Sequence, residues 1–188
     1  NRQGTTDDGQ RTADNGQPTM IYPIVKYGQK VLETPAEPVR EFNSDLEKLV
    51  ADMFETMYAA NGVGLAAPQI GLSKRLCVID VTSGESPDAR LVLANPLIVS
   101  TEGKAAQDEG CLSLPDFRAS TPRPARVTVR AQDIRGQEFI LTGEGLLARA
   151  FCHETEHLNG ILFIQHLSML KRDSIRRKVR KLMKAGEW

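Results

Sequence analysis

The sequence has little of several features that would assign a class of protein at once. Basic and acidic residues both number 24 among the 188 residues, so the chain has no net charge and gives no electrostatic sign of a nucleic-acid partner. Aromatic residues make up only 5%, which argues against a base-stacking surface. No apolar run approaches the length of a membrane-spanning helix. These absences exclude a membrane partner and give no support to nucleic-acid binding.

Cysteine is also scarce. Cys77, Cys111 and Cys152 are odd in number and form no C-x-x-C pair, which excludes a disulfide framework and a zinc ribbon and indicates a reducing compartment. The length fits one domain that can bury a core without cross-links. We expect this single domain to span residues 20–188.

Residues 1–19 are polar and show no apolar periodicity, so we expect them to be disordered. They contain no hydrophobic core of a secretory signal, and Asp7, Asp8 and Asp14 argue against an organelle transit peptide. Met20 is typical of a native start. Residues 1–19 are then either a dispensable leader or a remnant of expression.

The stretch that indicates chemistry is His153-Glu154-Thr155-Glu156-His157, which has the pattern His-Glu-x-x-His. On a helix, residues four apart lie one above the other on the same face, so His153 and His157 can bind one metal ion together. Glu154 lies beside them, in the place of a base that takes a proton from a metal-activated water. The alternative is a core helix whose histidines only form structural hydrogen bonds.

The helix that carries this pattern is predicted by spacing and by its end. Leu146, Ala150, His153 and His157 follow one stripe, and Asn159-Gly160 is a natural helix stop. Cys111 precedes an alternating apolar run and should lie on extended backbone. A thiolate suits the same divalent ions as imidazole, so Cys111 is the best third ligand, although a lone cysteine is more often simply buried. Cys77 and Cys152 are assigned to packing.

A glycine-rich segment, Gly62 to Gly71, follows the first predicted helix. Its Gly62-x-Gly64-x-x-Ala67 is not a dinucleotide loop, because such a loop follows a strand and opens a helix, and Pro68 would disrupt that helix. The glycines instead allow a substrate chain to approach the backbone closely. Gln69 then presents an amide that can donate to an oxyanion; a plain turn with a surface Gln is the equal alternative.

The remaining elements are predicted from periodicity and turn residues. A helix should begin at Asn43 or Ser44 and end near Ala60. Strands are expected over 76–81 and 91–99, a polar connection over 103–108, and a hairpin made of 126–130 and 139–141. A final helix over 173–183 has a strongly basic face, which is either solvated or contacts an anionic partner such as RNA. His166 is expected to be structural.

Three motifs occur in order: Gly62-x-Gly64-x-Ala66-Ala67-x-Gln69, then Glu109-Gly110-Cys111-Leu112-Ser113, then His153-Glu154-x-x-His157. Together they closely resemble peptide deformylase of the bacterial type with a C-terminal helix, over a range from about Met20 to the C-terminus. The resemblance implies an α+β fold with antiparallel or mixed sheets around a central metal-binding helix, flanked by one helix in the N-terminal half and one at the C-terminus.

The resemblance also implies a reaction and a site. A ferrous ion would be held by Cys111, His153 and His157, and Zn2+, Ni2+ or Co2+ could replace it in purified protein. Gln69 and the Leu112 N–H would bind the oxyanion, with Glu154 as the base. The methionine pocket would be bordered by Gly62, Val63, Gly64, Glu109, Arg118, Leu146 and Ala150. The substrates would be N-formylmethionyl nascent peptides, in the bacterial cytoplasm. The basic helix would dock on the ribosome, and we expect a monomer.

Glu156 stands where that family usually has Asp, and we expect it to pair with a nearby base such as Arg123. Two other functions compete with this reading. A zincin-type peptidase shares His-Glu-x-x-His but takes its third ligand downstream, where Phe163 replaces the last His of the extended pattern. A catalytically degenerate ribosome-binding protein would use only the basic helix.

Overall fold

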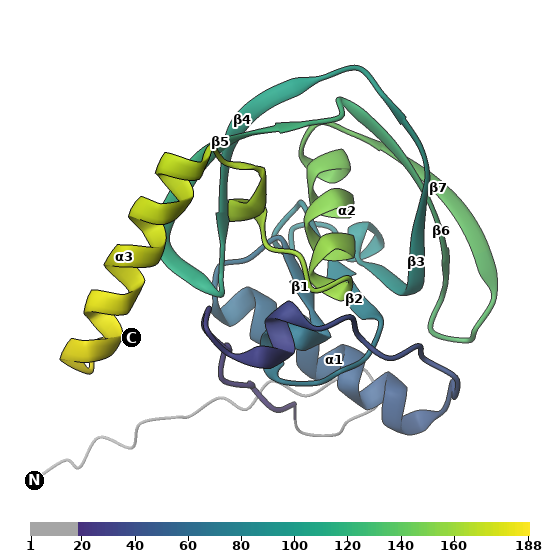
Figure 1. Ribbon diagram of the computed structural model, residues 1–188. Coiled ribbons are helices and arrows are strands. Elements are labelled where there is room, and N and C mark those ends of the chain that lie inside the picture. Colours follow the sequence, from purple (N-terminus) through teal and green to yellow (C-terminus); the bar gives the residue numbers. More distant parts are fainter. Residues whose placement is uncertain (1–18) are drawn as a thin grey trace, which may run out of the picture.

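The computed structural model describes residues 19–188, in which three α-helices, seven strands and four short 3-10 helices follow one another (Figure 1). All but the last residue of the predicted disordered segment 1–19 lie outside this range. The helices are α1 (Ser44–Ala59), α2 (Gly145–Leu158) and α3 (Met169–Ala185). The strands are β1 (Gly64–Ala66), β2 (Leu76–Ile79), β3 (Leu91–Glu102), β4 (Ala105–Cys111), β5 (Leu114–Arg123), β6 (Arg126–Gln132) and β7 (Glu138–Glu144). The 3-10 helices are η1 (Lys30–Glu33), η2 (Ala67–Ile70), η3 (Pro87–Ala89) and η4 (Phe163–His166).

The larger sheet has the order β1-β2-β3-β6-β7, with every neighbouring pair antiparallel. Side chains alternate across a strand, so β2 sends Cys77 and Ile79 to the cluster around α2, and Leu76 and Val78 to the cluster around α1. A helix therefore covers each face of this part of the sheet, which explains why the β2 segment is apolar at every position. Figure 1 shows α2 in the hollow of the curved sheet and α1 below it.

The predicted helices and the hairpin are confirmed. Helix α1 begins after Asn43, whose side-chain oxygen accepts a hydrogen bond from the Leu46 N–H at 3.1 Å. Strands β6 and β7 pair along their whole length. Helix α3 is longer than predicted, because Ser168 caps it five residues before Asp173 and the first turn exposes Met169 and Leu170. Exposed apolar residues at a helix start follow no periodic pattern that a sequence could reveal.

The predicted polar connection over 103–108 is wrong, because β4 begins at Ala105 and pairs with β5 in a separate two-stranded sheet. Only four of the seventeen residues of this ribbon are buried, so its sequence lacks the apolar alternation that would reveal a strand. Cys111 lies at the end of β4, next to a register shift, and the prediction of extended backbone there is confirmed.

Helix α2 runs through the centre of the molecule and is mostly buried. It ends as predicted, with Asn159 as the C-cap and Gly160 at φ 72°, a left-handed conformation that favours glycine. A Cβ at Gly160 would also lie only 2.8 Å from the Glu33 carbonyl carbon. The end of α2 is thereby fixed against η1, which sets how far His157 reaches into the core.

The predicted α+β class is confirmed. Cys77 and Cys152 are buried in the core, at 1% and 4% exposure, as the assignment to packing required. A third apolar cluster lies under α3, where Val179 packs with Leu114, Leu162 and Phe163. Within residues 19–188, no helix combines the length and the apolar character needed to cross a bilayer.

Candidate active site

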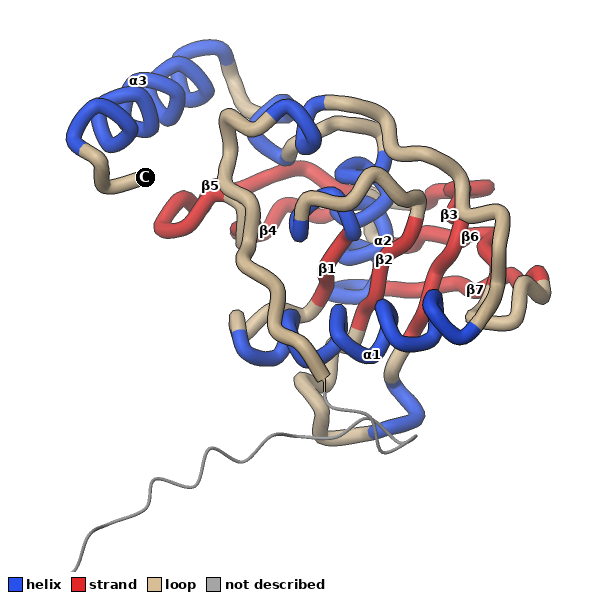
Figure 2. Tube along the Cα trace, turned by 90° about the horizontal axis from the view of Figure 1, so that it is seen from below, coloured by secondary structure: helices blue, strands red, loops and turns tan. Residues whose placement is uncertain are grey.

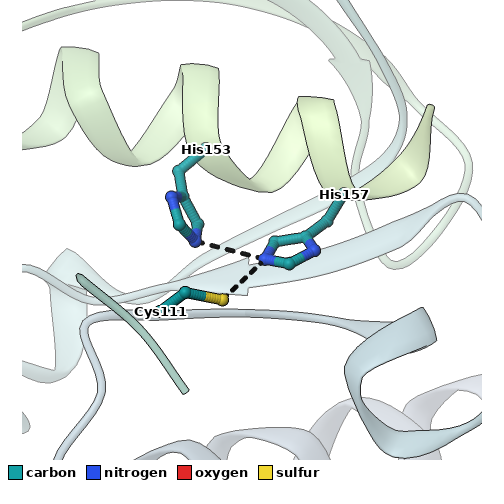
Figure 3. A group of neighbouring side chains, drawn as sticks. All are labelled: Cys111, His153 and His157. Carbon is teal, nitrogen blue, oxygen red and sulfur yellow. Dashed lines mark hydrogen bonds between the residues drawn. The ribbon is translucent and has the colours of Figure 1, made fainter. Parts of the chain in front are cut away.

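Cys111, His153 and His157 converge on one point. The two imidazoles project from the same side of α2 toward Cys111 on the facing strand (Figure 3). The His157 Nε2 atom lies 3.2 Å from both the Cys111 Sγ and the His153 Nε2. One ligand atom from each residue lies within 4.8 Å of the others. The fold therefore brings together the predicted ligands, two histidines of one helix and a cysteine distant in sequence.

The charges of these groups fit a divalent metal ion. Burial lowers the pKa of His157 well below its ordinary value, so its ring is neutral and offers a lone pair. Burial also lowers the pKa of His153, but hydrogen bonds with Cys111 and Glu109 outweigh that effect and raise this pKa well above its ordinary value. Positive charge is therefore favoured where the three ligand atoms meet. One thiolate and two imidazoles suit iron, zinc, nickel or cobalt and leave a coordination position open.

A buried ionic network supports the His153 ring. Its Nδ1 lies 2.6 Å from the Glu109 Oε1, so Nδ1 donates to this carboxylate and Nε2 is the ring atom that faces the other ligands. Arg123 donates to both Glu109 oxygens, at 2.6 and 2.8 Å. Burial would raise the pKa of Glu109, but hydrogen bonds from Arg123 and His153 lower it to about 2. Glu109 is thus an anion that orients a metal ligand.

The expected partner of Glu156 is confirmed. Arg123 Nη1 donates to the Glu156 Oε1 at 2.6 Å, and the His166 Nε2 lies 2.8 Å from the same oxygen. Arg123 therefore bridges the carboxylate behind His153 and a carboxylate of α2. His166 is structural, as predicted, and lies at the outer end of this network.

Glu154 is buried beside the metal ligands. Its side chain is 4% exposed, and its Oε2 has no hydrogen-bond partner within the described part of the chain. Burial raises the pKa of Glu154 to about 7, and a bound divalent cation would oppose that shift. A Cβ at Gly64 would overlap the Glu154 carboxylate, so the absence of a side chain at Gly64 leaves the room that this carboxylate occupies.

Gln69 is buried at 1% exposure, so the alternative of a surface Gln in a plain turn is wrong. The Ala66 N–H donates to its Oε1 at 2.9 Å, which fixes which way the amide faces. Its Nε2 then points to Cys111 Sγ at 3.6 Å and to Ser113 Oγ at 3.4 Å. The amide donor therefore faces the metal ligands. The dinucleotide-loop reading is also excluded by structure, since α1 precedes the segment and only the short η2 follows it.

These groups open on a cavity of about 760 Å3 between α2, β1 and the β4–β5 sheet. Every predicted site residue except His157 lines it. The residues predicted to border the substrate are all found in its wall: Gly62, Val63, Gly64, Glu109, Arg118, Leu146 and Ala150. The carboxylate of Glu109 is held by Arg123 and His153.

Arg149 and Phe117 also line the cavity wall, and the sequence alone did not reveal Phe117. Arg149 is 7% exposed and ties α2 to β4, donating to the Asp108 carbonyl oxygen at 3.0 Å and to Gln107 Oε1 at 2.9 Å. Phe117 lines the cavity from β5. Arg149 stands four residues before His153, where the resemblance to peptide deformylase already placed it beside the side-chain pocket.

Comparisons with known proteins agree with this geometry. A family model described as polypeptide deformylase matches residues 21–173. The chain is 58% identical over 169 residues to a peptide deformylase of Acidobacterium capsulatum, which covers 90% of this chain and 99% of the relative. A crystal structure of a peptide deformylase from Legionella pneumophila matches with a TM-score of 0.82 at 46% identity, covering 88% of this chain and 97% of that chain. The structure from Thermus thermophilus matches with a TM-score of 0.78 at 45% identity, covering 86% and 94%.

Proposed function

This chain belongs to the peptide deformylase family, and we propose that it is a metal-dependent hydrolase that removes the formyl group from the N-terminal formylmethionine of newly made polypeptides. The observation that carries the proposal is the convergence of Cys111, His153 and His157 beside a buried Glu154, with the Gln69 amide facing the same point. The products are formate and a free α-amino group.

The two competing functions have less support. A zincin-type peptidase would take its third metal ligand downstream of His157, whereas Cys111 lies upstream, and Phe163 is buried in the core. A degenerate, non-catalytic protein would not be expected to keep three converging ligands together with a buried carboxylate. Neither alternative accounts for the family match over residues 21–173.

A divalent ion held by Cys111, His153 and His157 would supply Lewis acidity and lower the pKa of a water molecule at the site toward neutrality. Glu154 accepts a proton from this water, and the oxygen adds to the formyl carbon. Gln69 Nε2 and the Leu112 N–H donate to the oxygen that becomes negative, each donor contributing about 3–4 kcal/mol. Glu154 then passes the proton to the departing nitrogen as the carbon–nitrogen bond breaks.

The formylmethionyl end of the substrate would occupy the cavity beside α2. Leu146 and Ala150 offer apolar surface from the helix, while Gly62, Val63 and Gly64 offer backbone to which a peptide can come close. Arg118 borders the cavity from β5. This arrangement suits a linear chain with an unbranched apolar first side chain.

Formate release from a formyl-Met peptide tests the proposal, with protein purified without oxygen and its bound metal quantified on the same sample. We expect turnover with about one ferrous ion per chain, the stoichiometry of a single three-ligand site. Turnover with zinc, nickel or cobalt bound in place of iron would also agree with the proposal, because one thiolate and two imidazoles bind all of these ions. Cleavage of an unformylated peptide, or no formate from fully loaded protein, would contradict the proposed function.

We also propose that α3 docks on the ribosome in the bacterial cytoplasm, where formylated chains emerge. Its exposed cations support this: Lys171, Arg176, Arg177, Lys178, Arg180, Lys181 and Lys184. Changing Arg177, Lys181 and Lys184 to Glu should abolish co-sedimentation with ribosomes and leave turnover of a short formyl peptide unchanged. Unaltered co-sedimentation would refute docking through α3. Sedimentation of the free protein should give the 20.7 kDa mass of a monomer.

A further inference from the structure

The N-terminal arm passes between β1 and the β4–β5 sheet (Figure 2). Its residues 25–27 are here called the strap. The Val25 N–H donates to the Gln69 carbonyl oxygen at 2.7 Å, and the Tyr27 N–H donates to the Ser113 carbonyl oxygen at 2.8 Å. Two backbone N–H groups of the strap, two residues apart, therefore hold carbonyls of two separate segments.

The two residues that the strap holds belong to the two segments with the proposed oxyanion donors. Gln69 supplies its side-chain amide, and Ser113 directly follows Leu112. Gln69 and Ser113 are 1% and 0% exposed and contact each other, with Gln69 Nε2 3.4 Å from Ser113 Oγ. Gln69 lies in η2, after β1 of the larger sheet, and Ser113 lies 44 residues away, in the turn between β4 and β5.

The strap is itself anchored by the end of α3. Trp188 Nε1 donates to the Tyr27 carbonyl oxygen at 2.8 Å, and the Lys26 ammonium lies 5.5 Å from the centre of the Trp188 ring. Gly28 has φ 107°, and a Cβ there would overlap Met183. Trp188 also packs edge-on against Phe117 of the cavity wall, with ring centroids 6.1 Å apart. One residue thus touches both the strap and the substrate cavity.

We propose that the strap is a positioning element of the catalytic site, which fixes the spacing between the Gln69 amide and the Leu112 N–H. The inference rests on the proposed function, because it assigns these two groups to the oxyanion. Charge develops on that oxygen only in the transition state, so a displaced donor lowers kcat and leaves KM nearly unchanged. A displacement of about 1 Å can cost about a hundredfold in rate.

Val25→Pro removes the N–H that holds Gln69, and Ile24→Pro is its matched control. The Ile24 N–H makes no hydrogen bond in the described part of the chain, and the arm already contains Pro23. We expect Val25→Pro to lower kcat about ten- to a hundredfold with little change in KM, while Ile24→Pro stays near the wild-type rate. Equal rates for Val25→Pro and the wild type would overturn the proposal.

A double-mutant cycle separates positioning from a general loss of structure. Each proline variant is also made with Gln69→Ala, which removes the amide that the strap positions. In this background we expect Val25→Pro to change kcat by less than about twofold, because the amide that the Val25 N–H positions is already absent. The same fold loss in both backgrounds would show that the strap does not act through Gln69.

Trp188→Phe provides a milder variant should Val25→Pro not fold. It keeps an aromatic ring against Phe117 and loses only the hydrogen bond to Tyr27. We expect kcat to fall by up to about fivefold, the value of one hydrogen bond, with little change in KM. An unchanged kcat would refute the strap. Absence of formate release by the wild type would instead refute the proposed function, so the two failures are distinguishable.

Discussion

Replacing Glu154 by alanine should leave about one metal ion per chain and lower kcat about a thousand- to ten-thousandfold, the upper range for loss of a general base. Glu154 is not one of the three converging ligands, so the metal should be retained. Its carboxylate is buried, and its Oε2 has no partner within residues 19–188. A buried carboxylate with a free oxygen is costly to maintain unless that oxygen has a task.

Glu154→Gln is a sharper test. The glutamine side chain fills the same space beside Gly64 as Glu154 and lacks only the carboxylate oxygen that accepts the proton. We expect it to be nearly as inactive as the alanine variant. Formate release and bound metal are measured on the same samples, with Glu47→Ala on the exposed surface of α1 as a control. A Glu154→Gln variant with the wild-type rate would show that another group takes the proton.

The local parts of this site could be predicted from the sequence because their geometry depends on helix spacing alone. His153 and His157 share a face by the 3.6-residue repeat, and Asn159-Gly160 ends the helix through its backbone preference. Cys111 could be selected only by its chemistry as a ligand. Its distance to His157, 46 residues away, depends on how the β4–β5 sheet lies over α2.

The parts that could not be predicted depend on tertiary contacts. The sequence suggested that Arg123 pairs with Glu156, but the bond of Arg123 to Glu109 was unforeseen, because β4 and β5 were not both recognised as strands. Glu109 was assigned to the substrate wall, and its carboxylate in fact supports His153. The strap is invisible in sequence, since its bonds are made by backbone groups that every residue except proline has.

Cys111→Ser should weaken metal binding by more than about a hundredfold. Loss of a residue that merely hydrogen-bonds a metal ligand already costs up to about a hundredfold, and Cys111 is itself a ligand. A serine hydroxyl is a poor ligand for the softer divalent ions that a thiolate and two imidazoles bind. Cys152→Ser is the matched control. Cys152 directly precedes His153 but is buried in the α2 core cluster and is not among the converging ligands. It should therefore keep its metal, although a buried hydroxyl lowers its stability.

The measurements for this prediction are metal content after dialysis against a chelator, and the thermal midpoint with and without added metal. An ion that binds only the folded chain stabilises it by about 2.7 kcal/mol at a hundred times its dissociation constant. Wild type and Cys152→Ser should therefore lose thermal stability when the metal is removed, while Cys111→Ser should show almost no difference. If Cys111→Ser kept its metal through dialysis, the third ligand would be another residue, and the convergence at α2 would need a different explanation.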